Sequence, residues 1–205
     1  MNPTALKTPR DLRRDAIIEV AREVFFEEGY AAASMSSIAA RLGGSKGTLY
    51  NYFRSKEELF EAQVREGCGR IADNVFDLAG DARPIADMLT QLGEDYLSII
   101  YSDWAVQTYR VIVAEALRSP QLARIFYESG PALGLQRLES YLEDARARGL
   151  VKMDDCNLAA GEFLSLCRGH QHFVYVLNLE DCPSPDQIKI HAQQAVSLFL
   201  KGYGV

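Results

Sequence analysis

At 205 residues, with 48% hydrophobic and 24% charged residues, the chain has the composition of a globular protein with a sizeable core. No apolar run approaches the ~20 residues of a membrane-spanning helix, and the basic first residues lack the apolar stretch of a signal peptide. We therefore expect a cytoplasmic protein that is neither secreted nor anchored.

The net charge of −6 is unfavourable for a nucleic-acid-binding protein, since phosphate neutralisation supplies most non-specific affinity. The charge is unevenly distributed, however. Residues 1–56 hold nine Lys or Arg against six Asp or Glu, whereas residues 57–205 hold 13 against 22. A basic head on an acidic body is typical of a protein that docks one end on DNA.

The four cysteines stand far apart and form no CxxC pair: Cys68, Cys156, Cys167 and Cys182. This spacing argues against a zinc site and against a disulfide framework. We expect reduced thiols, mostly buried, and no cofactor.

Helical periodicity without strand alternation predicts an all-α fold. Thr8 as N-cap and Pro9 at the first helical position begin a helix that ends near Glu28. Basic residues crowd its start: Lys7, Arg10, Arg13 and Arg14. Two interpretations stay open for these residues, an arm that reaches DNA and a solvated tail.

Two short helices around a glycine turn come next. Ser34 can cap a helix that begins near Met35. Gly43 and Gly44 end it, because glycine enters the left-handed conformation without a steric penalty. A second short helix is predicted over residues 46–53, and two helices joined in this way fit a helix-turn-helix.

The run GYAAASMSSIAARLGGSKGTLYNYFRSKEELF, residues 29–60, resembles the N-terminal DNA-binding domain of the TetR family of transcriptional regulators. Residues 109–151 resemble, more loosely, a common C-terminal domain subtype of the same family. The resemblance implies a three-helix helix-turn-helix head over residues 1–56 and a helical ligand-binding and dimerisation domain over residues 57–205. It implies a DNA-binding homodimer, which we predict to be a repressor released from a palindromic operator by a small molecule.

The resemblance also implies which residues contact DNA. Transferred by motif position, they are Ser34, Ser36, Lys46, Gly47, Thr48, Tyr50, Asn51, Tyr52 and Lys56. Lys46 can donate to guanine, and Gly47 lets the helix approach base edges closely. Tyr50 and Lys56 suit phosphate oxygens. Packing within the small head is the alternative for Tyr50 and Tyr52.

One residue departs from the family pattern. The family commonly has valine or another aliphatic residue where this sequence has Gly44. Loss of that side chain removes ~1–2 kcal/mol of apolar contact, so a softer turn is expected.

The rest of the chain predicts only helices, over residues 56–80, 84–100, 103–117, 119–129, 131–148, 157–179 and 184–200. Aromatic residues are plentiful there and can wall a cavity for a small apolar or aromatic ligand, although such residues are more often core. The candidate ligand contacts are Tyr101, Trp104, Tyr109, Phe126, Phe163, His170 and Phe173.

The resemblance implies that the last two helices pair with their copies across a two-fold axis. Small residues in these helices would permit close approach of the partner: Ala159, Ala160, Gly161, Ala192 and Ala195.

The sequence argues against two classes of enzyme. A phosphate loop needs Gly-Lys-Ser/Thr after a strand, whereas Lys46 precedes Gly47 and the segment follows a helix. A di-iron carboxylate bundle needs Glu-x-x-His pairs, which the three histidines lack. We therefore predict that the chain is not an enzyme, and a ligand-free architectural DNA-binding protein stays as the remaining alternative.

Overall fold

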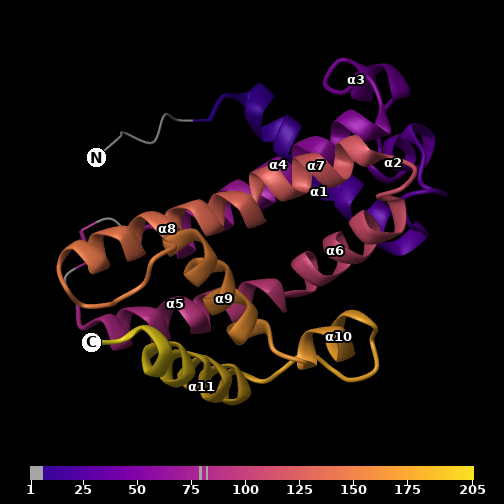
Figure 1. Ribbon diagram of the computed structural model, residues 1–205. Helices are drawn as coiled ribbons and strands as arrows, with labels where there is room; N and C mark the ends of the chain where they lie inside the picture. Colours follow the sequence, from indigo (N-terminus) through magenta and orange to yellow (C-terminus); the bar gives the residue numbers. More distant parts are fainter. Residues whose placement is uncertain (1–6, 79, 82) are drawn as a thin grey trace. The chain divides into compact units, whose positions relative to one another are not determined.

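The computed structural model describes residues 7–78, 80–81 and 83–205, and within these ranges every regular element is a helix (Figure 1). The predicted all-α fold is confirmed. The helices are α1 (Pro9–Glu28), α2 (Met35–Arg41), α3 (Lys46–Tyr50), α4 (Lys56–Val75), α5 (Ile85–Ile100), α6 (Asp103–Glu115), α7 (Pro120–Ser129), α8 (Pro131–Ala147), α9 (Cys156–Arg168), α10 (Gln171–Val176) and α11 (Pro185–Tyr203). The head predicted over residues 1–56 includes residues 1–6, and the helix predicted over residues 56–80 includes Ala79. Residues 1–6 and Ala79 lie outside the described residues.

Side-chain caps begin several helices where the sequence predicts them. Thr8, Ser34 and Ser184 each accept a hydrogen bond from the backbone N–H three residues later, and the residue there bonds back to the cap. α1 ends at Glu28, because Gly29 turns the chain with a φ of 80°. These helix ends are confirmed because a few neighbouring residues determine each of them.

Some helices differ in extent from the prediction. α3 ends at Tyr50, not near Phe53, because a tighter turn follows, in which the N–H of Tyr52 donates to the Leu49 carbonyl at 3.0 Å. α4 ends at Val75 and not at residue 80. The single helix predicted over residues 157–179 is two helices, α9 and α10. Gly169 separates them with a φ of 57°, outside the right-handed helical region.

The chain divides into two compact units. The first unit comprises residues 1–67 and 111–126, and the second comprises residues 68–110 and 127–205. The first unit is therefore discontinuous in sequence. The helices α4 and α6 each pass from one unit into the other, at residues 67–68 and 110–111 respectively.

The core of the first unit centres on aromatic side chains. Phe25 and Tyr30 both meet the ring of Phe60, with ring centroids 5.3 and 5.0 Å apart. Leu49 and Phe53 are buried, so the inward face predicted for the second short helix is confirmed. This packing fixes α3 against the rest of the unit and leaves its opposite face free.

In the second unit, α11 packs against α5 and α9, and α8 packs against α9 (Figure 1). The α5–α11 pair approaches closely, since a Cβ added at Gly93 would lie only 3.1 Å from the Ala192 Cβ. Phe163 of α9 packs edge-on against Phe199 of α11, with centroids 5.3 Å apart. Small residues therefore set the helix spacing, and large aromatic residues fill the layer between the helices.

Cys68, Cys156 and Cys167 are buried and unbridged, while Cys182 is exposed. The expectation of mostly buried thiols is confirmed. Within the described ranges, none of the helices combines the length and the apolar character needed to cross a bilayer.

Candidate functional site

The helix-turn-helix is held by serine caps. Ser34 and Ser37 exchange hydrogen bonds at 3.1 Å, each hydroxyl accepting from the other residue's backbone N–H. Gly43 takes the left-handed turn with a φ of 67°, and the Ser45 hydroxyl accepts from the Thr48 N–H at 3.2 Å. These local bonds fix the entry of α3, because short helices have few internal bonds of their own.

One face of α3 is open to solvent. Lys46 and Gly47 are exposed, and Tyr50 keeps 50% of its surface accessible. Packing as core, the alternative for Tyr50, is therefore wrong, whereas Tyr52 is half-buried. The remaining candidates at this surface also keep access to solvent: Ser34, Ser36 and Asn51 are exposed, and Thr48 is half-buried. The structure thus presents a polar, solvent-accessible face on α3.

Lys56 has an internal role that its motif position does not reveal. Its ammonium donates to the carbonyls of Tyr30, Ala31 and Ala33 at 2.8, 3.3 and 3.1 Å, and lies 4.7 Å from the centre of the Tyr30 ring. All three N–H donors of the ammonium are in use. A phosphate contact by Lys56 stays a prediction, and it would require exchange of one of these bonds.

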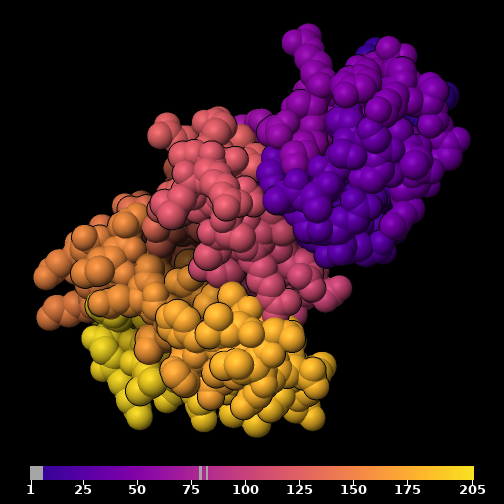
Figure 2. Space-filling view, turned by 90° about the vertical axis from the view of Figure 1, so that its right-hand side faces the viewer, coloured from indigo at the N-terminus to yellow at the C-terminus, as the bar shows by residue number. Residues whose placement is uncertain are grey.

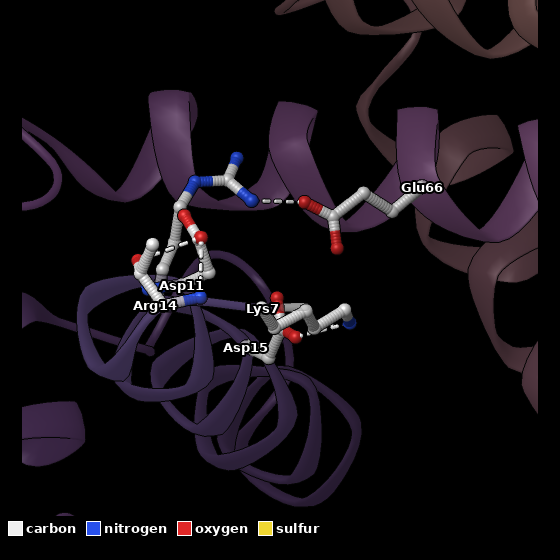
Figure 3. Close-up of polar contacts among 6 residues, drawn as sticks. Lys7, Asp11, Arg14, Asp15 and Glu66 are labelled. Carbon is white, nitrogen blue, oxygen red and sulfur yellow. Dashed lines mark hydrogen bonds and ion pairs between the residues drawn. The ribbon is translucent and has the colours of Figure 1, made fainter. Parts of the chain in front are cut away.

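Some basic residues at the start of α1 have ion-pair partners within the first unit, and others have none among the described residues. Lys7 lies 2.5 Å from Asp15, and Arg14 forms an ion pair with Glu66 of α4 (Figure 3). Arg14 also lies over the Phe53 ring, 5.3 Å from its centre. Arg14 therefore joins α1 to α4 within the first unit.

Four exposed cations of the first 56 residues form no ion pair within 4.0 Å among the described residues. They are Arg10, Arg13, Lys46 and Arg54. Arg41, in contrast, is paired with Glu27 at 2.6 Å. Exposed cations without an ion-pair partner can neutralise DNA phosphates and so release the counterions condensed on the DNA. Arg54 was not predicted to contact DNA, because no motif position marks it.

Arg13 lies beside the glycine turn. A Cβ placed on Gly44 would be 3.6 Å from a terminal nitrogen of Arg13. Gly44 has no positive φ, so its backbone does not require glycine. The space of the missing side chain therefore borders a guanidinium, which brings a cation to the turn that precedes α3.

The predicted ligand contacts do not form one group. Tyr101 and Phe163 are buried, Trp104, Tyr109 and Phe126 are half-buried, and His170 and Phe173 are exposed. Phe126 belongs to the first unit and the others to the second. Phe163 is packed into the α9–α11 core. Three of the predicted residues, Tyr101, Tyr109 and Phe173, do converge, and they meet at a residue outside the predicted set.

That residue is His172 of α10. Its ring lies between Tyr101 and Tyr109, with centroid distances of 6.0 and 5.7 Å. Its Nδ1 atom is buried and has no hydrogen-bond partner. Burial, with a smaller contribution from Arg168, lowers the pKa of His172, so the ring is neutral near pH 7. Nothing in the sequence pattern distinguishes His172 from His170, because both stand within three residues of Phe173 and neither belongs to a recognisable motif.

Arg110 of α6 holds α10 in place. Its guanidinium donates to the carbonyls of Val176 and Tyr175 at 2.8 and 3.0 Å, and to the Asn178 side chain at 3.3 Å. These carbonyls are at the C-terminal end of α10, where a cation is favoured. The aromatic residues around His172 are thereby fixed by two helices, α6 and α10.

Comparison with known families settles the class of the chain. The family profile described as bacterial regulatory proteins, tetR family, matches residues 17–63. The profile described as the C-terminal domain of AefR-like transcriptional repressors matches residues 87–205, more than half of the chain. The chain belongs to the TetR family of transcriptional regulators. The resemblance of residues 29–60 and 109–151 is confirmed, and the chain is a regulator rather than an enzyme.

Relatives of this TetR-family chain share most of its length. The regulator UidR of Escherichia coli K12 is 28% identical over 152 residues, which cover 73% of this chain and 74% of UidR. A solved TetR-family structure from Mesorhizobium loti MAFF303099 is 28% identical, with a TM-score of 0.84, over 97% of this chain and 100% of its own. The flavonoid-responsive regulator FrrA is 36% identical, with a TM-score of 0.77, over 94% of this chain and 97% of its own.

The last helices of this TetR-family chain carry a solvent-facing apolar stripe. The prediction that small residues face a partner copy is wrong, because Ala159, Ala160, Ala192 and Ala195 are buried in the core of their own chain, and Gly161 is next to Leu135. The exposed apolar residues are Leu158 and Leu166 of α9 and Ile190 and Leu198 of α11. Each pair is spaced by eight residues, which places its members on one side of the helix.

Proposed function

We propose that this chain is a homodimeric repressor that binds a palindromic operator and releases it when a small aromatic molecule binds the body. In this proposal residues 1–56 are the DNA-binding domain and residues 57–205 the ligand-binding and dimerisation domain. The observation that carries it is the open face of α3, which presents Lys46 and follows a turn beside Arg13, two cations that form no ion pair among the described residues. The AefR-like repressor profile over residues 87–205 supports repression over activation.

On the DNA, each part of the α3 surface has a role that follows from its chemistry. Lys46 reads guanine in the major groove, and Gly47 allows the backbone to approach. Tyr50 donates its exposed hydroxyl to a phosphate oxygen. Arg10, Arg13 and Arg54 neutralise phosphates, which adds affinity without sequence preference.

The second copy binds through the apolar stripe of α9 and α11. Leu158, Leu166, Ile190 and Leu198 lie on two helices that pack together, so the same surface on two copies can form one isologous four-helix interface. A dimer is required because two recognition helices must enter successive major grooves ~34 Å apart.

The ligand is a planar aromatic molecule of the flavonoid class. Two observations support this class. FrrA, which is described as flavonoid-responsive, is 36% identical over nearly the whole chain. The second unit also contains an aromatic cluster around His172 that flat rings can stack on. Binding shifts the dimer away from the operator-binding state, which requires tighter ligand binding to the other state.

A gel-shift titration tests the proposal. The purified protein is mixed with DNA from upstream of its own gene, with and without 7-hydroxyflavone, and with a scrambled DNA of the same composition as control. We expect a retarded complex on the upstream DNA alone that 7-hydroxyflavone dissociates. Equal affinity for scrambled DNA would contradict binding to a specific operator, and a complex that 7-hydroxyflavone leaves intact would contradict the proposed ligand class.

A further inference from the structure

The strongest feature that the proposed function leaves unused is a pair of buried polar atoms without partners. Nδ1 of His172 is one, and Oγ1 of Thr108 is the other; Thr108 is 0% exposed. Thr108 directly precedes Tyr109 on α6, and the Tyr109 ring is one of the two rings that flank His172. A buried polar group without a partner loses the hydration it has in the unfolded chain, so native proteins usually supply a partner.

The neighbouring polar groups are committed elsewhere. The Tyr101 hydroxyl, on the ring that flanks His172, donates to the Arg168 carbonyl at 3.2 Å. Nε of Arg168 donates to the Leu164 carbonyl at 3.4 Å, and the Arg110 guanidinium donates to the end of α10. None of these groups pairs with Nδ1 of His172, which has no hydrogen-bond partner among the described residues.

One edge of the cluster lies at the molecular surface. Phe173, which follows His172, is 66% exposed, and its ring centroid lies 6.4 Å from that of His172. The α10 segment, amber in Figure 2, is part of the molecular surface in that view. Because Nδ1 itself is buried, a flat molecule would reach it by displacing the exposed Phe173 ring, with Tyr101 and Tyr109 supplying further ring faces.

We propose that the ligand carries an aromatic hydroxyl that pairs with Nδ1 of His172 while its ring system packs among Tyr101, Tyr109 and Phe173. A hydroxyl is the group that fits, because it donates to a bare ring nitrogen and accepts from a protonated one. The ring stays uncharged near pH 7, so the pairing needs no ionised ligand. The proposal rests on the proposed function and adds to it the group by which the ligand is selected.

Calorimetric titration with a matched series of flavones tests this pairing. The three probes are 7-hydroxyflavone, 7-methoxyflavone and unsubstituted flavone, which share one ring system. We expect 7-hydroxyflavone to bind the wild-type dimer about tenfold more tightly than either of the others, which corresponds to about 1.4 kcal/mol for one hydrogen bond. The single tryptophan, Trp104, lies one helical turn before Thr108 and gives an independent fluorescence signal of binding.

Variants of His172 and His170 show whether the preference for the hydroxyl depends on His172. In His172→Phe the preference for the hydroxyl is lost while flavone binding is kept, and His172→Asn restores part of it because its amide places a polar atom near the Nδ1 position. His170→Phe is the matched control, since His170 is exposed, and it keeps the full preference. His172→Asn also serves if His172→Phe does not fold.

The outcomes separate this inference from the function on which it rests. Equal affinity of all three flavones for the wild type, or an unchanged preference in His172→Phe, overturns the pairing and leaves the operator and the ligand class intact. The second result would assign the Nδ1 atom to an ordered water. Absence of binding by every flavone overturns both the pairing and the ligand class.

Discussion

Two lysines of the first unit, Lys46 and Lys56, are expected to respond in opposite ways to the same substitution. Both belong to the predicted DNA-contacting set. The Lys46 ammonium is exposed and unpaired among the described residues, whereas the Lys56 ammonium donates to three carbonyls. Methionine keeps the length and the apolar stem of lysine but removes the charge and the donors.

The magnitude for Lys56→Met follows from its contacts. Two of the three accepting carbonyls, those of Tyr30 and Ala33, are partly buried and lose their partner. Because Lys56 is only half-buried, its hydrogen bonds together contribute ~1.5–2 kcal/mol, the lower end of the range for a single bond from a charged group, and the contact with the Tyr30 ring adds ~0.5–1 kcal/mol. Since the third carbonyl is exposed and can recover water, we expect a loss of about 2–3 kcal/mol in the free energy of unfolding.

Urea unfolding followed by circular dichroism measures this loss. With a slope of ~2–3 kcal/mol per molar urea, the midpoint of Lys56→Met should fall by ~1 M. Lys46→Met should change the stability by less than ~0.5 kcal/mol, yet alter which operator bases are preferred. A Lys56→Met protein with an unchanged midpoint and no operator affinity would refute the reasoning, because the ammonium would then contact DNA and not the carbonyls.

Three further predictions concern other parts of the chain. Gly44→Ala should raise the free energy of unfolding by ~0.4–1 kcal/mol in thermal unfolding, because nothing lies closer than 3.6 Å to the new Cβ. Gly43→Ala should lower it by ~1–2 kcal/mol, because Gly43 has a φ of 67°. A loss of stability in Gly44→Ala would mean that Arg13 cannot move aside. Arg13→Ala should reduce the slope of log affinity against log salt by ~1, equally for every operator variant, and an unchanged slope would remove Arg13 from the phosphate contacts. Leu198→Glu should convert the dimer to a monomer in sedimentation at micromolar concentration, with Ile190→Ala as a milder control, and a dimeric Leu198→Glu protein would place the interface elsewhere.

The features predicted correctly from sequence are those that neighbouring residues decide. The caps at Thr8, Ser34 and Ser184 and the turn at Gly29 each depend on a few consecutive residues. The break at Gly169 is also local, but apolar periodicity continues on both sides of it and outweighed the single glycine.

The features that were missed depend on residues far apart in sequence. The three carbonyls that accept from Lys56 lie 23–26 positions earlier, and no spacing rule connects them. Ala192 was assigned to a partner surface because its size suits close approach, but its partner is Gly93 of the same chain. His170 and His172 differ by two positions, yet His170, which precedes α10, is exposed, whereas His172 within α10 has a buried Nδ1 atom.

The discontinuity of the first unit limits how such regulators can be recombined. Residues 111–126 pack with residues 1–67, so an exchange of DNA specificity between relatives at a single junction after α4 would carry only part of the unit. The transferred segment would then pack against the end of α6 and against α7 of the recipient protein, whose side chains evolved to pack against a different surface. Functional hybrids should therefore need two exchanged segments, or a compensating set of substitutions between residues 111 and 126.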